Sequence, residues 1–295
     1  MPRMAIIYVT YGCNFSCNGC LCNQFNAEKV FMDFEQFKRI TTQLKEYGVK
    51  SIELGGGGEP LLHPDIEKII NWIVNKLHLH LGIITNGSML YYKPLCCLIA
   101  DKADYIRVSL YENSYNSVIK KVEKLIQIKE AINGKATIGI KFLADQNNQN
   151  FILSAIKQSV LIPGINHISV KAKRGDSQIF DYSVLQKQIN DLHDERICVN
   201  LNKTILTEKC WLSPIHTMID PKGNVYICCY YMDREKEHCI GNILEKDFDQ
   251  IWGSQEHLSK LNHINPHKCN IYDCRWHNYN KDMSEFLNNV HHQFC

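Results

Sequence analysis

Three cysteines near the start of the chain have a spacing suited to holding one small inorganic cluster. Cys13, Cys17 and Cys20 follow the pattern C-x3-C-x2-C, directly after an apolar segment at residues 4–10. Three thiolates in one loop can bind an iron–sulfur cluster while one of its irons keeps no protein ligand. Because such an iron can take up a further ligand, the spacing indicates a reactive centre.

A run of glycines forms the second motif. Gly55 to Gly58 are followed by Glu59 and Pro60. Without Cβ atoms the backbone can approach a ligand closely, and carbonyls together with a carboxylate suit a cationic amine. A phosphate-binding loop is excluded, because the Lys and the Ser or Thr of that motif are missing and Glu59 would repel phosphate.

Hydrophobic patterning places both motifs at the ends of strands. Strands are predicted at residues 4–10, 49–55, 80–86, 105–111, 136–143 and 167–173, and helices at 34–47, from Pro64 to Leu77, and at 114–131, 149–160 and 181–194. Asp33 is the expected N-cap of the helix at 34–47. Alternating strands and helices predict a parallel sheet, open or closed into a partial barrel, with ligands at the carboxyl ends of its strands.

The cysteine spacing and the glycine segment together resemble the radical S-adenosylmethionine (SAM) superfamily over residues 4–175. The resemblance implies an α/β fold, a partial (β/α)6 TIM-like barrel. It also implies that the three cysteines hold a [4Fe-4S] cluster whose unique iron is chelated by SAM, and that Gly57, Gly58 and Glu59 receive the ammonium group of SAM. Zinc knuckles can share the bare cysteine spacing, so the glycine motif is what favours the cluster.

Polar residues at further strand ends are candidates for contacts with cofactor or substrate. Similarity to this family suggests that Asn86 and Ser109 contact SAM and that Lys141 pairs with its carboxylate. Lys171 and Arg174 are candidates for a catalytic role on the substrate. A strand lysine that is exposed is most often only solvated, and that alternative stays open here.

A second set of cysteines lies in the C-terminal part of the chain. Beyond residue 205 short strands and dense Cys, His and aromatic residues replace the strand–helix alternation, which predicts one domain at 1–204 and a small α+β domain at 205–295. The pattern C-x12-G-x4-C from Cys210 to Cys228 resembles the SPASM and twitch auxiliary-cluster domains. With Cys269 and Cys274, these cysteines would hold one auxiliary [4Fe-4S] cluster, although a structural zinc site would use the same ligands.

Both resemblances imply an enzyme that cleaves SAM to methionine and a 5′-deoxyadenosyl radical, which abstracts a hydrogen atom from the substrate. The expected outcome is oxidation or epimerisation of a small molecule of the sugar or aminocyclitol type, with Cys239 as the candidate hydrogen donor for epimerisation. A reducing protein such as flavodoxin or ferredoxin would supply the electron. Two alternatives stay open: a maturase of a ribosomally synthesised peptide, and a non-catalytic iron–sulfur or zinc module.

Composition narrows the class of protein. Hydrophobic residues make up 45% and charged residues 22% of the 295 residues, as in globular proteins, and a net charge of +2 gives no reason to expect nucleic acid or membrane partners. The apolar start is too short for a signal peptide, so a cytoplasmic location is expected. In a reducing compartment the 14 cysteines favour metal or cluster ligation over disulfides.

Overall fold

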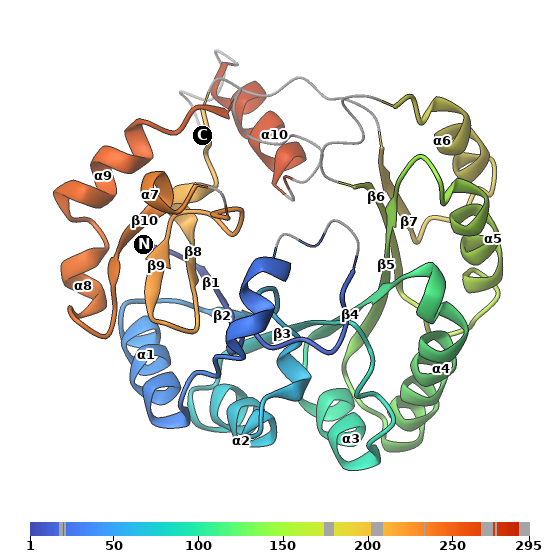
Figure 1. Cartoon of the computed structure of the whole chain (residues 1–295), viewed down its shortest axis with the longest axis horizontal. Helices are drawn as coiled ribbons and strands as arrows, with labels where there is room; N and C mark the ends of the chain where they lie inside the picture. Colours follow the sequence, from blue (N-terminus) through green and yellow to red (C-terminus); the bar gives the residue numbers. More distant parts are fainter. Residues whose placement is uncertain are drawn as a thin grey trace.

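The computed structural model describes residues 1–17, 20, 22–173, 180–201, 209–232, 234–266, 274 and 276–288, except the side chains of Asn26, Ala27 and His277. Its strands form one sheet of ten in the order β10-β9-β8-β1-β2-β3-β4-β5-β6-β7. Figure 1 looks along the resulting barrel, with the strands around its centre and the helices outside them. The fold is therefore the α/β partial barrel that the sequence predicts.

The strands from β1 to β7 run parallel to one another, and β8 runs parallel to β1 on its other side. β9 is antiparallel to both β8 and β10. The strands are β1 (Met4–Ile7), β2 (Ser51–Leu54), β3 (His80–Thr85), β4 (Tyr105–Leu110), β5 (Thr137–Ala144), β6 (His167–Ala172), β7 (Ile197–Asn200), β8 (His216–Ile219), β9 (Asn224–Tyr226) and β10 (Cys239–Asn242).

The helices are α1 (Phe34–Glu46), α2 (Ile66–Asn71), α3 (Lys93–Lys102), α4 (Tyr115–Ile132), α5 (Gln149–Ser159), α6 (Ser183–Asn190), α7 (Glu235–His238), α8 (Phe248–Ile251), α9 (Gln255–Asn262) and α10 (His277–Asn288). The predicted N-cap of α1 is confirmed, because the Asp33 carboxylate accepts hydrogen bonds from the backbone N–H groups of Glu35 and Gln36. No helix in the described ranges is long and apolar enough to cross a membrane.

The structure contains every strand predicted in residues 1–175 and adds β7 to the parallel series. β7 lacks a strong sequence signal because it has four residues, none of them fully buried. The predicted boundary between residues 204 and 205 falls in 202–208, outside the described residues. On its C-terminal side, β8 pairs with β1 in parallel register, so the C-terminal region extends the same sheet.

The side chains of each barrel strand alternate between the helices and the barrel interior. On β1, Ala5 and Ile7 belong to the large core between sheet and helices, whereas Ile6 belongs to a separate interior cluster. Interior positions on the other strands are partly polar, among them Glu53 and Arg107. The apolar core between the sheet and the helices therefore stabilises the fold, and polar side chains can occupy the barrel interior.

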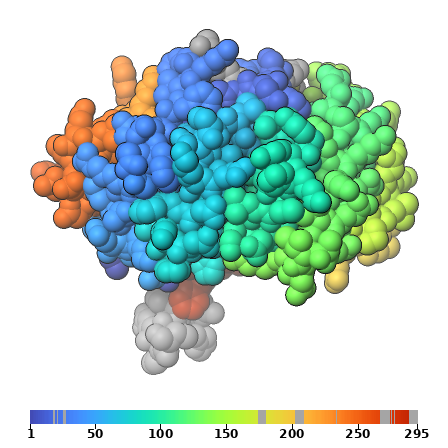
Figure 2. All heavy atoms as spheres, turned by 90° about the horizontal axis from the view of Figure 1, so that it is seen from below, coloured from blue at the N-terminus to red at the C-terminus, as the bar shows by residue number. Residues whose placement is uncertain are grey.

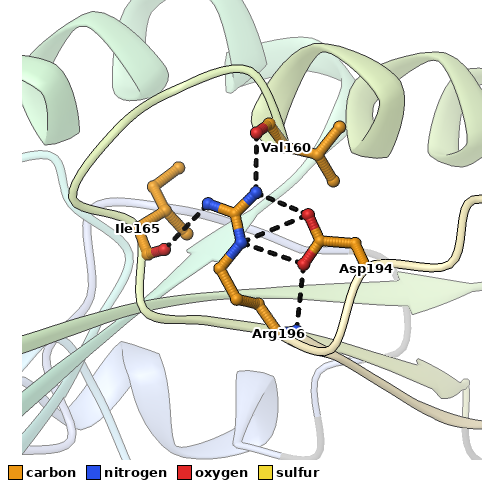
Figure 3. Close-up of polar contacts among 4 residues, drawn as sticks. All are labelled: Val160, Ile165, Asp194 and Arg196. Atoms are coloured by element: carbon orange, nitrogen blue, oxygen red, sulfur yellow. Dashed lines mark hydrogen bonds and ion pairs between the residues drawn. The ribbon is translucent and has the colours of Figure 1, made fainter.

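A half-buried clamp holds the start of β7 in place. Arg196 donates hydrogen bonds to the carbonyl oxygens of Val160 (2.6 Å) and Ile165 (3.1 Å) and pairs with the carboxylate of Asp194 (Figure 3). The first two acceptors lie in the connection between α5 and β6. One guanidinium therefore joins this connection to the segment that leads into β7.

We expect Arg196→Met to lower the free energy of unfolding by about 2 kcal/mol, because two carbonyl groups and one carboxylate lose a charged hydrogen-bond donor. Chemical denaturation followed by circular dichroism measures the change. Arg39→Met is the matched control, since Arg39 is half-exposed and its nearest carboxylate oxygen, on Asp247, is 3.8 Å away. Equal stability of the two variants would show that the clamp contributes nothing.

Candidate active site

The cysteine loop leaves the carboxyl end of β1 and is shaped before it reaches Cys13. The hydroxyl group of Thr10 donates to the carbonyl of Val30 (2.7 Å) and accepts from the backbone N–H of Gly12 (2.8 Å). The backbone N–H of Tyr11 also donates to Val30 (3.0 Å). These bonds anchor the start of the loop, and Cys13 directly follows this anchored segment.

The glycine segment packs directly against this loop. The backbone N–H groups of Gly58 and Glu59 donate to the carbonyls of Thr10 (2.8 Å) and Gly12 (2.9 Å). A Cβ atom on Gly58 would lie 2.0 Å from the carbonyl oxygen of Gly12, and one on Gly57 would lie 2.7 Å from that of Thr10. Gly57 also has a φ of +69°, a conformation that favours glycine. The sequence interpretation explained the glycines by a ligand, whereas here they approach the chain's own cysteine loop.

Glu59 is buried, with 2% of its surface exposed, and both oxygens of its carboxylate are engaged. Oε1 accepts from the Thr85 hydroxyl (2.6 Å) and the Leu61 N–H (3.1 Å), and Oε2 accepts from the Asn86 N–H (2.6 Å). Burial raises the pKa of Glu59 to about 7, although these hydrogen bonds favour the charged form. The carboxylate of Glu59 thus holds the carboxyl end of β3 and the backbone of Asn86, and its predicted contact with the ammonium group of SAM stays a prediction.

Asn86 brings the end of β3 to the cysteine loop. Its side-chain Nδ2 donates to Oδ1 of Asn14 (3.0 Å) and lies 3.7 Å from the sulfur of Cys13. Its Oδ1 accepts from the N–H of Ser88 (2.8 Å). The predicted cofactor contact Asn86 therefore lies beside the first predicted cluster ligand.

Tyr111, which was not predicted as a site residue, lies directly after β4 and, like Asn86, contacts a predicted cluster ligand. Its hydroxyl forms hydrogen bonds with the thiol of Cys17 and with Ser109. Ser109 pairs in register with Lys141 on β5, so both predicted contacts lie close to this tyrosine. The alternation of the strand was the available signal, because Ser109 and Tyr111 are two residues apart and share one face.

The three thiols of the first set share one small region. Burial raises the pKa of Cys17, and negative charge on Cys20 and Cys13 would raise it further, while the bond with Tyr111 lowers it. A hydrogen bond with the Cys22 thiol lowers the pKa of Cys20 to about 6. Iron would relieve the mutual repulsion of three thiolates, and thiolates are the ligands it takes in such clusters. The residues present therefore fit an iron–sulfur cluster.

No three Cys, His, Asp or Glu side chains converge as ligands of a single metal ion anywhere in the described part of the chain. This does not conflict with a cluster. In a four-iron cluster each cysteine binds a different iron, so the sulfurs need not meet around one point.

Two cysteines of the second set, Cys210 and Cys228, lie at the opposite end of the barrel strands from Cys13. Cys210 precedes β8 and Cys228 follows β9, and β8 is parallel to β1 whereas β9 is antiparallel to β8. Both cysteines are therefore at the amino end, while Cys13 follows the carboxyl end of β1. In Figure 2 blue residues of the N-terminal part reach the upper edge of the molecule, whereas the red residues near the C-terminus lie at the lower edge.

The described contacts of the second set involve α10. The sulfur of Cys210 is 3.1 Å from the Ser213 hydroxyl and 3.9 Å from the side-chain nitrogen of Asn280. Asn280 also accepts from the N–H of Trp211 (2.6 Å), which ties α10 to this segment. Cys274 is half-buried, and Cys269 lies outside the described residues, as does Arg174. The four-cysteine set thus remains a prediction.

A cavity of about 140 Å³ occupies the barrel interior between the two ends. Gly55 and Gly56 line it on one side, Cys229 and Tyr230 on another, and charged side chains from successive strands complete it. Lys141 and Lys171, predicted from the sequence, are among those side chains; Arg107 and Glu53 are additions that the structure supplies.

Cys239, the predicted hydrogen donor, is not among the residues that line this cavity. It belongs to β10, at the edge of the sheet, and its thiol faces the carbonyl oxygen of Gly241 at 3.6 Å. Among the described cysteines, the one that lines the cavity is Cys229.

A buried carboxylate joins the cysteine loop to the C-terminal hairpin. Oδ2 of Asp220 accepts from the hydroxyls of Tyr11 (3.0 Å) and Tyr226 (3.1 Å), and the Tyr11 hydroxyl is 3.1 Å from that of Tyr231. Oδ1 accepts from backbone N–H groups in the turn between β8 and β9, including that of Asn224 (2.9 Å). Asp220 thus orders the turn and the residues next to both cysteine sets.

We expect Asp220→Asn to lower the free energy of unfolding by about 2 kcal/mol, because an amide cannot accept all of these bonds through two oxygens. Thermal unfolding and the iron content after anaerobic purification are the measurements. Tyr11→Phe, which removes one of the bonds and leaves the carboxylate, should cost about 1 kcal/mol. An Asn variant as stable as the Phe variant would contradict this role of Asp220.

Comparison with known proteins agrees with this geometry. The family model "Radical SAM superfamily" matches residues 7–143, and the model "Iron-sulfur cluster-binding domain" (SPASM) matches residues 210–275. The two matched segments contain the first and the second cysteine set, respectively.

Curated relatives share about a quarter of their residues with the chain. A tungsten-containing aldehyde ferredoxin oxidoreductase cofactor-modifying protein of Pyrococcus furiosus is 23% identical, over 84% of this chain and 80% of that protein. The subtilosin biosynthesis protein AlbA of Bacillus subtilis is 23% identical, over 86% of this chain but only 60% of its own length. The mycofactocin maturase MftC of Mycolicibacterium smegmatis is 24% identical, over 86% and 70%.

Solved structures share the fold. The structure of BtrN with AdoMet and 2-DOIA has a TM-score of 0.56 and 17% identity, covering 90% of this chain and 89% of that one. The structure of anSMEcpe with bound AdoMet has a TM-score of 0.63 and 14% identity, covering 93% and 87%. The radical SAM match implies SAM and a [4Fe-4S] cluster as cofactors, and the SPASM match implies auxiliary iron–sulfur binding. The chain belongs to the radical SAM superfamily and carries a C-terminal SPASM iron–sulfur domain.

Proposed function

We propose that this radical SAM enzyme oxidises or epimerises a sugar-type small molecule held in the barrel cavity. The observation that carries the proposal is the position of that cavity, since Cys13 lies beyond one end of the strands, and Cys210 and Cys228 lie beyond the other. A substrate there has one reactive centre on each side. When bound, the cofactors supply hydrogen-atom abstraction at one centre and a one-electron acceptor at the other.

The proposed roles follow from the contacts described. Cys13, Cys17 and Cys20 hold the first cluster, and Cys210, Cys228, Cys269 and Cys274 hold the auxiliary one. The backbone of Gly57 and Gly58, with Asn86, Ser109 and Lys141, contacts SAM, because these residues surround the cysteine loop at neighbouring strand ends. Glu59 acts through Asn86, whose backbone it holds.

Cavity residues have separate proposed roles. Lys171 lines the cavity one strand beyond Lys141 and contacts the substrate. Cys229 replaces Cys239 as the candidate hydrogen donor for an epimerisation, because Cys229 lines the cavity. Burial raises the pKa of Cys239, which packs against the interior cluster that contains Cys229.

The test uses the full chain, reconstituted anaerobically with iron and sulfide and reduced by flavodoxin or dithionite. We expect it to convert SAM to 5′-deoxyadenosine and to transfer deuterium into that product from a deuterated sugar-type substrate. Protein that contains both clusters but forms no 5′-deoxyadenosine would overturn the proposal. Deuterium that appears in 5′-deoxyadenosine only with a peptide would shift the substrate to the second candidate below.

Peptide maturation is the second candidate, favoured by the names of two relatives. The proteins AlbA and MftC, named for bacteriocin biosynthesis and for maturation, align with most of this chain. A peptide encoded beside this protein that keeps both its intact mass and the configuration of its residues, after incubation with the reduced enzyme and SAM, would argue against it.

A further inference from the structure

The sulfur of Cys13 has a side-chain hydrogen-bond donor whose orientation is fixed. Nδ2 of Asn86 lies 3.7 Å from this sulfur and 3.0 Å from Oδ1 of Asn14, so its two N–H bonds have two separate acceptors. The oxygen of the same amide accepts from the backbone N–H of Ser88 (2.8 Å). An amide bonded through both its oxygen and its nitrogen cannot turn over without losing those bonds. Its N–H group therefore keeps facing Cys13.

A chain of two hydroxyl groups reaches the sulfur of Cys17. The hydroxyl of Ser109 bonds to that of Tyr111, which in turn bonds to Cys17. An iron-bound thiolate can only accept a hydrogen bond, so Tyr111 is the donor once Cys17 has lost its proton. The oxygen of Tyr111 then accepts from Ser109, and bonds in such a chain strengthen one another. Tyr111 therefore presents its proton to the sulfur of Cys17.

The sulfur of Cys20 has its side-chain donor inside the cysteine loop. The thiol of Cys22 bonds to it, and the backbone N–H groups of Cys22 and Asn23 donate to the same sulfur. Cys22 is buried, with 7% of its surface exposed, and belongs to the interior cluster that also contains Tyr8 and Tyr11. A thiol is a weak donor, but in a buried site its hydrogen bond is electrostatically stronger than in water. Each of the three predicted ligands thus has a side-chain donor, and each donor comes from a different segment.

We propose that Asn86, Tyr111 and Cys22 set the reduction potential of the first cluster through these three hydrogen bonds. The uptake of one electron adds negative charge to the cluster and its thiolate sulfurs, so a donor that faces a sulfur stabilises the reduced form more than the oxidised form. The donors therefore raise the potential and make reduction by the electron-supplying partner easier. Tyr111 and Cys22 act through the ligands and are positioning residues. This inference rests on the proposed assignment of the first cysteine set as cluster ligands.

The test is a potentiometric titration of the anaerobic, reconstituted enzyme without SAM, in which dithionite supplies electrons and electron paramagnetic resonance measures the reduced clusters. The signal of the first cluster is the one missing from the variant with Cys13, Cys17 and Cys20 all replaced by Ala. We expect Tyr111→Phe and Cys22→Ala each to lower the ratio of reduced to oxidised first cluster about threefold to tenfold at a fixed potential, which moves its midpoint about 30–60 mV more negative. The auxiliary cluster in the same sample should keep its midpoint.

Matched controls separate the hydrogen bonds from packing. Tyr115→Phe removes another buried tyrosine hydroxyl, which donates to the carbonyl of Ala155 (3.2 Å), and should leave the midpoint of the first cluster unchanged. Cys22→Ser keeps a side-chain donor and should hold the midpoint close to that of the wild type. A packing role alone would give Ser no advantage over Ala at this position.

Four results would overturn the inference: an unchanged midpoint in both Tyr111→Phe and Cys22→Ala, an equal shift in Tyr115→Phe, the same shift in Cys22→Ser as in Cys22→Ala, or a first cluster that assembles in neither test variant. In the last case the residues would be needed to bind the cluster and not to set its potential. If only one test variant assembles the cluster, that variant decides.

Failure of this inference is distinguishable from failure of the ligand assignment on which it rests. A variant without the three cysteines of the first set that keeps every signal of the wild type would refute the ligand assignment. Loss of one signal from that variant, together with unshifted midpoints in the test variants, would refute this inference alone.

Discussion

A variant with Cys13, Cys17 and Cys20 all replaced by Ala should lose one cluster and all detectable cleavage of SAM. A four-iron cluster held by these thiolates cannot form without them, so the iron content should fall from about eight to about four atoms per chain. SAM cleavage should drop by more than about a thousandfold, since removing an essential reactive group costs rate factors of this order. Iron and sulfide analysis with electron paramagnetic resonance measures the first effect, and 5′-deoxyadenosine formation the second.

The control for this prediction is Cys198→Ser. Cys198 is exposed on β7 and belongs to neither cysteine set, so its replacement should leave both iron content and SAM cleavage unchanged. A triple variant that contains no iron at all would refute the assignment of a separate cluster to the C-terminal cysteines. A triple variant that still cleaves SAM would refute the first site.

Replacing Gly58 with Ala should also have a large effect, but through a steric clash and not through the loss of cluster ligands. The added Cβ would lie 2.0 Å from the carbonyl oxygen of Gly12 and 2.6 Å from its carbonyl carbon, and backbone atoms cannot move away as a flexible side chain can. We expect a loss of more than about 3 kcal/mol in the free energy of unfolding, or a displaced cysteine loop that no longer holds its cluster. Thermal unfolding and iron content distinguish these outcomes.

Gly139→Ala is the matched control. A Cβ at Gly139 would lie 3.3 Å from the nearest atom, the carbonyl oxygen of His167, so this backbone atom has to shift by only a few tenths of an ångström. The same substitution should therefore cost less than about 1 kcal/mol there. If Gly58→Ala retains normal stability and a full complement of iron, the close approach of the two loops is not what requires glycine.

Local sequence signals were sufficient for the barrel and the first cysteine set. Apolar runs at regular intervals predict parallel strands, because a strand covered on both faces needs such runs. Cys13, Cys17 and Cys20 belong to one loop, so their spacing alone limits how far apart their sulfurs lie. The cap at Asp33 is equally local, since it depends on backbone groups two and three residues away.

Other features depend on strands that are far apart in the sequence. Arg107 and Glu53 read as ordinary strand residues until the barrel turns them toward the same cavity as Lys141 and Lys171. The hydrogen bond from Tyr11 to Asp220 spans 209 positions, and no local pattern predicts which buried hydroxyl meets which carboxylate. The set of charged side chains that line one cavity therefore became visible only in the assembled barrel.

The glycine segment and Glu59 combine features that the sequence predicts with features that only the tertiary structure shows. Their residue types and their place after the second strand predict a functional site from the sequence alone. Only the tertiary structure shows what Gly57 and Gly58 accommodate, because the nearest atoms that a Cβ would meet belong to Thr10 and Gly12, in a different part of the chain. Spacing along the sequence determines which residues can act together in one loop. Packing between segments that are distant in the sequence determines which other parts of the protein those residues contact.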